Sequence, residues 1–212
     1  MKRGQFITFE GGEGMGKSTQ VRLLAESLTE RGIDVLVTRE LGGTPGSEAI
    51  RELLLHPPGE GWTIEAEALL FAAARADHVA RAILPALQEG RWVLCDRFVD
   101  SSRAYQGIAG SLTDEAVATL HAIGSKGLMP DLTIVLEAPE AEVNSRLERR
   151  DSGVSDAIGG RAAAFHASVN SAFREIAANE PERVRLIDAS GSIEDVRARV
   201  LDAIAPLFVD QT

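Results

Sequence analysis

The chain has 212 residues, of which 44% are hydrophobic and 25% charged, a balance typical of a globular protein with a substantial core. Its formal net charge of −10 argues against a broad nucleic-acid-binding surface, because phosphate backbones are bound by an excess of Lys and Arg. No apolar run reaches the roughly 20 residues that a membrane-spanning helix needs, so we expect no membrane partner. The single cysteine, Cys95, fits a reducing compartment, which indicates the cytoplasm. We expect one domain over 1–212.

The first 40 residues read as strand, loop, helix and strand. Residues 6–9 are a short aromatic and β-branched run, and the glycines after it are followed by apolar residues at helical spacing from Val21 to Leu28. Gly32 can take the left-handed conformation that ends a helix, and residues 35–38 then form a second apolar run. The sequence therefore opens with a βαβ unit.

The same alternation continues to the end of the chain. A helical pattern over 65–88, with a break at Pro85, precedes an apolar strand over 92–95, and Thr113 can cap a helix that runs toward Gly124. Strands at 132–136 and 184–187 flank helices over 141–149 and 162–179, and Ser192 can cap the last helix. Such alternation predicts an α/β fold, a five-stranded parallel sheet with helices on both faces.

One stretch, residues 149–161, has small, polar and glycine-rich residues in place of a periodic pattern. This composition favours a lid over a site, although an ordinary connection between two helices fits it equally well.

A phosphate-binding motif lies between the first strand and the first helix. Gly11, Gly16, Lys17 and Ser18 fill the pattern G-x-x-x-x-G-K-[ST], and Lys17 is one of only three lysines. Backbone N–H groups of such a loop surround a polyphosphate, the lysine contacts the outer phosphates and the serine hydroxyl is a ligand for Mg²⁺. The motif predicts nucleotide binding, but NTPases, ligases and kinases all use it, so the acceptor has to be identified from other residues.

Open α/β sheets bind ligands at the edge where their strands have their carboxyl ends. Three further clusters of polar residues fall at or near this edge of the predicted sheet, or on a helix that can face it. They are residues 38–44 together with Arg51, residues 71–75, and residues 96–106. Together with the phosphate loop, these clusters resemble bacterial thymidylate kinases along nearly the whole chain, most specifically in its first half. The resemblance implies a P-loop fold of the nucleoside monophosphate kinase type, phosphorylation of dTMP by ATP with Mg²⁺, and a homodimer packed through helices.

The resemblance also implies roles for individual residues. ATP would be bound by the loop and its flank, namely Gly11, Gly12, Glu13, Gly14, Met15, Gly16, Lys17, Ser18 and Thr19. The dTMP site would consist of Glu40, Arg51, Phe71, Arg75, Arg97, Ser102, Tyr105 and Gln106. In it, Arg51 and Arg97 would hold the acceptor phosphate, Phe71 would stack on thymine, Arg75 would donate to thymine O4, and Tyr105 would pack where a 2′-hydroxyl would sit. Lys17, Arg97 and Asp96 would be catalytic, and Ser18, Glu10 and Asp96 would organise Mg²⁺, directly or through water. Taken singly, Phe71 is more typical of a core residue, and Arg51 and Arg75 fit solvated helix faces equally well.

Two departures from the family pattern concern the site. Leu41 stands where the family usually has proline, which makes the geometry around Glu40 less rigid. The lid reads Asp156-Ala157-Ile158-Gly159 where an Asp-Arg pair followed by Glu is common, and Glu13 of the phosphate loop cannot replace that charge. We predict that Arg149 or Arg150 supplies it.

Three alternative functions stay open at this point. The chain could be a kinase for another nucleoside monophosphate, or a nucleotide-binding protein with impaired catalysis because of its altered lid. A P-loop GTPase is the third, but the sequence lacks the Asn/Thr-Lys-x-Asp segment that reads guanine.

Overall fold

The computed structural model describes residues 2–150 and 163–209. Five strands form one sheet, and they are β1 (Phe6–Glu10), β2 (Val35–Arg39), β3 (Trp92–Asp96), β4 (Leu132–Glu137) and β5 (Val184–Asp188). The strand order is β2-β3-β1-β4-β5 and every pairing is parallel, so that Thr8 of β1 lies level with Cys95 of β3 and Thr133 of β4. The predicted five-stranded parallel sheet is confirmed.

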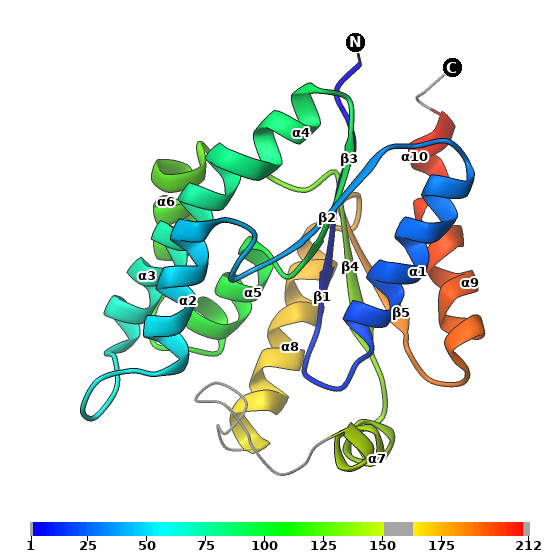
Figure 1. The fold of residues 1–212 in the computed structure, drawn as a ribbon. Helices are drawn as coiled ribbons and strands as arrows, with labels where there is room; N and C mark the ends of the chain where they lie inside the picture. Colours follow the sequence, from blue (N-terminus) through cyan, green and yellow to red (C-terminus); the bar gives the residue numbers. More distant parts are fainter. Residues whose placement is uncertain (1, 151–162, 210–212) are drawn as a thin grey trace.

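Helices cover both faces of this sheet (Figure 1). Successive side chains of a strand point to opposite faces, and β1 is apolar on both: Ile7 packs with Val21 and Leu24 on one side, and Phe6 packs with Val79 and Ile83 on the other. All five residues of β1 are buried, as expected for a central parallel strand. The first face carries α1 (Lys17–Glu30), α9 (Ile193–Ile204) and α10 (Pro206–Val209).

The second face and the carboxyl edge carry the remaining described helices. These are α2 (Pro45–Leu55), α3 (Ile64–His78), the π-helical turn η1 (Val79–Ile83), α4 (Leu84–Gln88), α5 (Val99–Ser102), the π-helical turn η2 (Arg103–Ile108), α6 (Asp114–Ser125), α7 (Glu140–Arg150) and α8 (Ala163–Asn179).

The predicted helix ends agree with the structure where a capping residue marks them. The Thr113 hydroxyl accepts the amide of Ala116 at 3.1 Å, and Ser192 forms a reciprocal capping box with Asp195. Gly32, just after α1, has a φ of 78°.

Three features differ from the predicted elements. The pattern over 65–88 is divided by η1, which ends just before Pro85 at the start of α4, because proline has no N–H to donate to the preceding turn. Helix α2 was not predicted, although Thr44 caps it and Pro45 follows at its first position. Helix α5 and η2 were not predicted either, since their polar residues show no amphipathic period.

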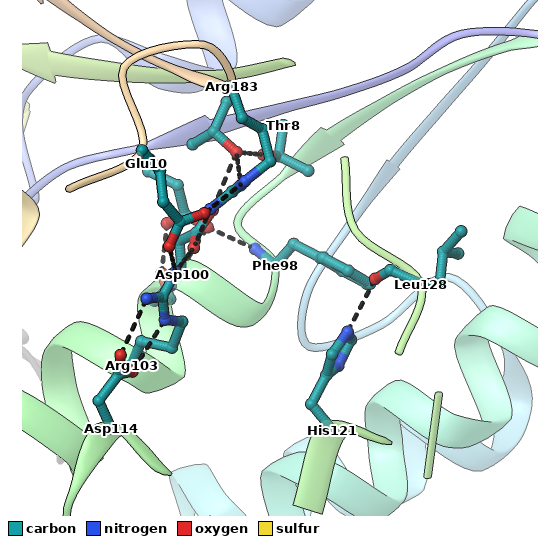
Figure 2. A network of polar contacts seen from close by, with 12 residues as sticks. Thr8, Glu10, Phe98, Asp100, Arg103, Asp114, His121, Leu128 and Arg183 are labelled. Carbon is teal, nitrogen blue, oxygen red and sulfur yellow. Dashed lines mark hydrogen bonds and ion pairs between the residues drawn. The ribbon is translucent and has the colours of Figure 1, made fainter. Parts of the chain in front are cut away.

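A buried ionic cluster fixes α5 and η2 against the sheet (Figure 2). The fully buried carboxylate of Asp100 accepts two hydrogen bonds from Arg183, at 2.6 and 3.0 Å, and one from Thr133 at 2.9 Å. Arg103 donates to it at 3.1 Å, and Thr8 extends the cluster to β1 through the Thr133 hydroxyl at 2.9 Å. Burial alone would raise the pKa of Asp100, but hydrogen bonds and charge from Arg183 bring that pKa below its usual value.

Candidate functional site

The phosphate loop joins the carboxyl end of β1 to the first turn of α1. Gly11 has a φ of 121°, and a Cβ there would lie 2.4 Å from the carbonyl oxygen of Leu136, so only glycine fits this position. Gly16, the N-cap of α1, has a φ of 86°. The loop therefore presents its backbone at a helix N-terminus, as the sequence motif predicts.

Lys17 folds back along this loop. Its Nζ donates to the carbonyl oxygens of Gly11 at 3.1 Å and Gly12 at 2.7 Å, and the side chain is buried. Burial, and then the charge of Arg97, lowers the pKa of Lys17 to about 7. A polyphosphate in the loop adds negative charge beside this amine and so favours its protonated form.

Ser18 and Asp96 form the part of the site that fits a magnesium ion. The Ser18 hydroxyl donates to the Asp96 carboxylate at 2.7 Å, which joins the start of α1 to the end of β3. A hydroxyl and a carboxylate are the hard oxygen ligands that Mg²⁺ prefers, and the ion commonly takes its other ligands from phosphates and water. Within residues 2–150 and 163–209, no group of three or more His, Cys, Asp or Glu side chains is arranged to hold a metal by itself.

Glu10, at the end of β1, contacts the start of α5. It is fully buried, and its Oε1 accepts the amides of Phe98 at 2.7 Å and Ser101 at 3.2 Å. Its Oε2 accepts the Ser101 hydroxyl at 2.6 Å. Burial, together with the charge of Asp100, raises the pKa of Glu10 to about 7. Both carboxylate oxygens therefore hold the start of α5, and the metal role of Glu10, directly or through water, stays a prediction.

Arg97 lies at the centre of the site. Its backbone has a φ of 70°, a left-handed conformation that is uncommon for a residue other than glycine. Its Nη1 donates to the Ser101 hydroxyl at 3.1 Å, and its guanidinium carbon lies 5.4 Å from the centroid of the Tyr105 ring. The guanidinium is thus held on two sides.

Two adjoining clefts open at this edge of the sheet. The larger, of about 730 Å³, is lined by the second half of the phosphate loop, by Asp96 and Arg97, and by α7 and the segment after β5. The smaller, of about 170 Å³, contains seven of the eight residues predicted for the acceptor, namely Glu40, Arg51, Phe71, Arg97, Ser102, Tyr105 and Gln106. Residues from β2 to η2, far apart in sequence, thus meet in one pocket as the resemblance predicts.

Arg75, the eighth predicted residue, does not line this pocket. It is buried behind the wall, where its Nε donates to Glu40 at 2.8 Å and its Nη2 donates to the Ser102 hydroxyl at 2.8 Å. Its guanidinium carbon also lies 5.4 Å from the centroid of the Phe98 ring. In this conformation Arg75 orients two pocket residues, and its predicted contact with thymine O4 stays a prediction.

The sequence analysis missed one wall of the larger cleft. Glu142 and Arg146 of α7 lie there with Ser192 and Ile193 at the start of α9, and Arg146 donates to the carbonyl oxygen of Ala189 at 2.7 Å. The segment after β5 is at the carboxyl end of a strand, so the general rule for open α/β sheets could have located it. Its small and apolar residues carry no motif.

Two predictions concern the loops of the site, and both stay predictions. The peptide bond between Glu40 and Leu41 is cis, and Arg51 Nη1 donates to the carbonyl oxygen of Leu41 at 3.2 Å. Residues 151–161 of the predicted lid lie outside the described residues, and so do the side chains of Arg149 and Arg150, which end α7. The basic residue of the lid therefore stays a prediction.

A glycine-rich loop at the carboxyl edge of a parallel sheet, with a buried lysine and a serine–aspartate pair, defines a P-loop nucleotide-binding protein. The family model for thymidylate kinase matches residues 9–200, so the chain belongs to the thymidylate kinase family and is a kinase.

Individual relatives agree with this assignment over nearly their full length. The chain is 56% identical to a thymidylate kinase of Rhizorhabdus wittichii over 205 residues, which are 97% of this chain and 99% of the relative. It is 49% identical to one of Bradyrhizobium sp. strain ORS 278, over 95% of this chain and 90% of the relative. The crystal structure of thymidylate kinase from Ehrlichia chaffeensis matches with a TM-score of 0.77 and 31% identity, over 95% of this chain and 99% of the other.

No helix in the two described ranges, 2–150 and 163–209, is both long and apolar enough to cross a bilayer.

Proposed function

We propose that this kinase transfers the γ-phosphoryl group of ATP to the 5′-phosphate of dTMP, giving ADP and dTDP. The observation that carries the proposal is that four residues line both clefts: Glu13, Glu40, Arg51 and Arg97. A triphosphate on the loop and a monophosphate in the smaller pocket would therefore meet at the same two arginines. In-line transfer requires this arrangement of donor and acceptor.

The main role of these side chains is to neutralise the negative charge of the donor and acceptor phosphates. Phosphoryl transfer passes through a loose transition state, so a nucleophilic side chain is not needed. The planar guanidinium groups of Arg51 and Arg97 suit the acceptor phosphate, and Lys17 and the loop amides suit the donor. Mg²⁺ held by Ser18 and Asp96 would neutralise charge on the outer phosphates of the nucleotide.

The lining of the smaller pocket suits a pyrimidine deoxynucleotide. Phe71 offers a flat apolar face for the base, while Tyr105 packs beside Arg97 and is 5% exposed. We assign the base to Phe71 and Gln106 and the sugar to Tyr105.

The test is ADP release by the purified protein with Mg-ATP, with and without dTMP, and with dUMP, CMP and GMP in parallel. We expect release that depends on the acceptor and is fastest with dTMP. Release that does not need an acceptor would identify an NTPase, and ATP binding without release would identify a nucleotide-binding protein. Faster release with CMP or GMP would identify a kinase for another nucleotide.

We also propose that two copies of the chain pair through α3 and α6. These neighbouring helices expose large apolar side chains, Leu69 at 56% and Ile123 at 77% of their surface, and Ala73 is exposed beside them. Light scattering should give the mass of a dimer for the wild type and of a monomer for Ile123→Glu. A monomeric wild type at micromolar concentration would contradict this pairing.

The cytoplasm is the compartment we propose for this reaction. Cys95 is a free, buried thiol, which suits a reducing environment.

A further inference from the structure

Helix α3 presents three residues to the acceptor site at four-residue intervals, Glu67, Phe71 and Arg75. Phe71 lines the pocket and Arg75 supports its wall, whereas Glu67 has no role in the sequence analysis. In the structure, Gln106 Nε2 donates to Glu67 Oε1 at 2.8 Å. Glu67 therefore belongs to the acceptor site through its contact with Gln106.

The amide oxygen of Gln106 has no hydrogen-bond partner among the described residues. The Gln106 side chain lines the pocket and is 2% exposed, and its Oε1 is buried without a hydrogen bond from any described residue. A buried acceptor without a donor costs about 1–3 kcal/mol. A ligand that brings an N–H group to this oxygen removes that cost.

The orientation of the Gln106 amide follows from the chemistry of its neighbour. An ionised carboxylate only accepts hydrogen bonds, so the amide nitrogen has to face Glu67. The amide oxygen is then left as the group that the pocket can use. If a neutral amide replaced Glu67, either end of Gln106 could face it, and the orientation would no longer be fixed.

We propose that Glu67 is a specificity-determining residue, which acts by holding Gln106 with its oxygen available to the N3–H group of a pyrimidine base. This inference rests on the proposed function, since it concerns the base of the acceptor. Thymine and uracil both carry a hydrogen on N3, whereas N3 of cytosine is an acceptor. An acceptor placed against Gln106 Oε1 leaves two lone pairs facing each other, so cytosine nucleotides are rejected. Discrimination is strong where a polar group of the site is left unpaired by the wrong substrate.

The test is the variant Glu67→Gln, assayed with dTMP, dUMP and dCMP at saturating ATP. We expect the ratio of kcat/KM for dTMP to that for dCMP to fall at least about tenfold, because Gln106 can turn its NH₂ group toward N3 of cytosine. The ratio for dTMP to dUMP should stay within about twofold, because both bases carry N3–H. A general loosening of the pocket would lower all three values together and leave both ratios unchanged, and that result would overturn the proposal.

Two further variants serve as controls. Glu65→Gln removes an exposed carboxylate from the same turn of α3 and should leave both ratios unchanged. Glu67→Asp keeps an acceptor-only group and should keep the discrimination against dCMP, so it also tests the inference if Glu67→Gln does not fold. Loss of discrimination in Glu67→Asp would count against it. A wild type without dTMP-dependent ADP release would refute the proposed function instead, so the two failures are distinguishable.

Discussion

The Ser101 hydroxyl donates to Glu10 Oε2 at 2.6 Å. The same hydroxyl oxygen accepts from Arg97 Nη1 at 3.1 Å. Ser101 thus connects a fully buried carboxylate at the end of β1 to the guanidinium that lines both clefts. Arg97 has a left-handed backbone, and Glu10 accepts the amides of Phe98 and Ser101 that follow it. The position of Arg97, the arginine that we propose binds the acceptor phosphate, is therefore set by contacts from the buried end of β1.

Removing this hydroxyl should weaken the acceptor site selectively. In Ser101→Ala, we expect the KM for dTMP to rise about tenfold, because a hydrogen bond to a charged group contributes about 1.5–3 kcal/mol. The KM for ATP should change less than about twofold, because the phosphate loop does not depend on Ser101. Steady-state kinetics with each substrate varied in turn would measure both values.

Ser125 offers a matched control for this variant. It is also buried, at 1% exposure against 9% for Ser101, but its hydroxyl has no hydrogen-bond partner among the described residues. Ser125→Ala should leave both KM values unchanged. Equal effects of the two variants would show that the KM change reflects loss of a buried serine and not release of Arg97.

The buried carboxyl of Glu10 should make stability depend on pH. Its pKa is raised from 4.5 to about 7, so the native state holds this proton more tightly than the unfolded state does. Its contribution to stability is therefore complete below pH 4.5 and is lost as the pH rises through about 7. The size of the effect is on the order of 3 kcal/mol. Glu10→Gln is neutral at every pH, so the stability of the wild type relative to this variant should fall by about that amount between pH 4 and pH 8.

Urea unfolding of both proteins at several pH values would measure this difference. Only the difference between the two proteins is informative, because other groups titrate in the same range. A constant difference across the range would mean that Glu10 has the same pKa in the folded and unfolded states, so that burial does not raise it.

The sequence predicts the fold well because the strands are parallel and three of the five lie inside the sheet, although β2 and β5 are partly exposed edge strands. Strands such as 6–9 and 132–136 are buried on both faces, so they are continuous apolar runs that need no tertiary information to be recognised. Thr113 and Ser192 could be identified as caps because a cap depends on local hydrogen bonds. Helix α5 and η2 were missed because polar residues make up much of them, and ion pairs of Asp100 hold them together with the apolar contacts of Val99 and Ala104.

In the candidate site, too, local features could be predicted from the sequence, and contacts between distant residues could not. The phosphate loop is contiguous in sequence, and its conformation depends on its own glycines. The contacts of Glu10 were not predicted because they depend on where Phe98 and Ser101 lie, and these residues are about 90 positions away. The contact between Glu67 and Gln106 joins two helical segments whose packing a single sequence does not reveal.

Lys17 should be essential for turnover but not for folding. Its amine is bonded to two loop carbonyls, and it is the basic side chain of the phosphate motif. Lys17→Ala should lower kcat by at least about 10² while far-ultraviolet circular dichroism stays unchanged, since a group that neutralises transition-state charge is worth several kcal/mol. Lys2→Ala, which removes an exposed lysine, should have wild-type turnover. Wild-type activity of Lys17→Ala with dTMP would refute the mechanism.

Asp100, at the centre of the ionic cluster behind α5, should contribute strongly to the stability of the fold. Asp100 is fully buried and pairs with Arg183 and Arg103. Asp100→Asn removes the buried negative charge between these two guanidinium groups, leaves them only the partly exposed Glu180 and Asp114 as charged partners, and turns an amide NH₂ toward a donor. We expect the free energy of unfolding to fall by about 3–5 kcal/mol, as for other buried ion pairs that lose one partner. Asp114→Asn is the matched control, because Asp114 also pairs with Arg103 but its side chain is 39% exposed, and it should cost less than about 1 kcal/mol. Urea unfolding of the wild type and the two variants would measure these changes. If Asp100→Asn lost no more free energy of unfolding than Asp114→Asn, burial would not strengthen the contribution of Asp100 to stability.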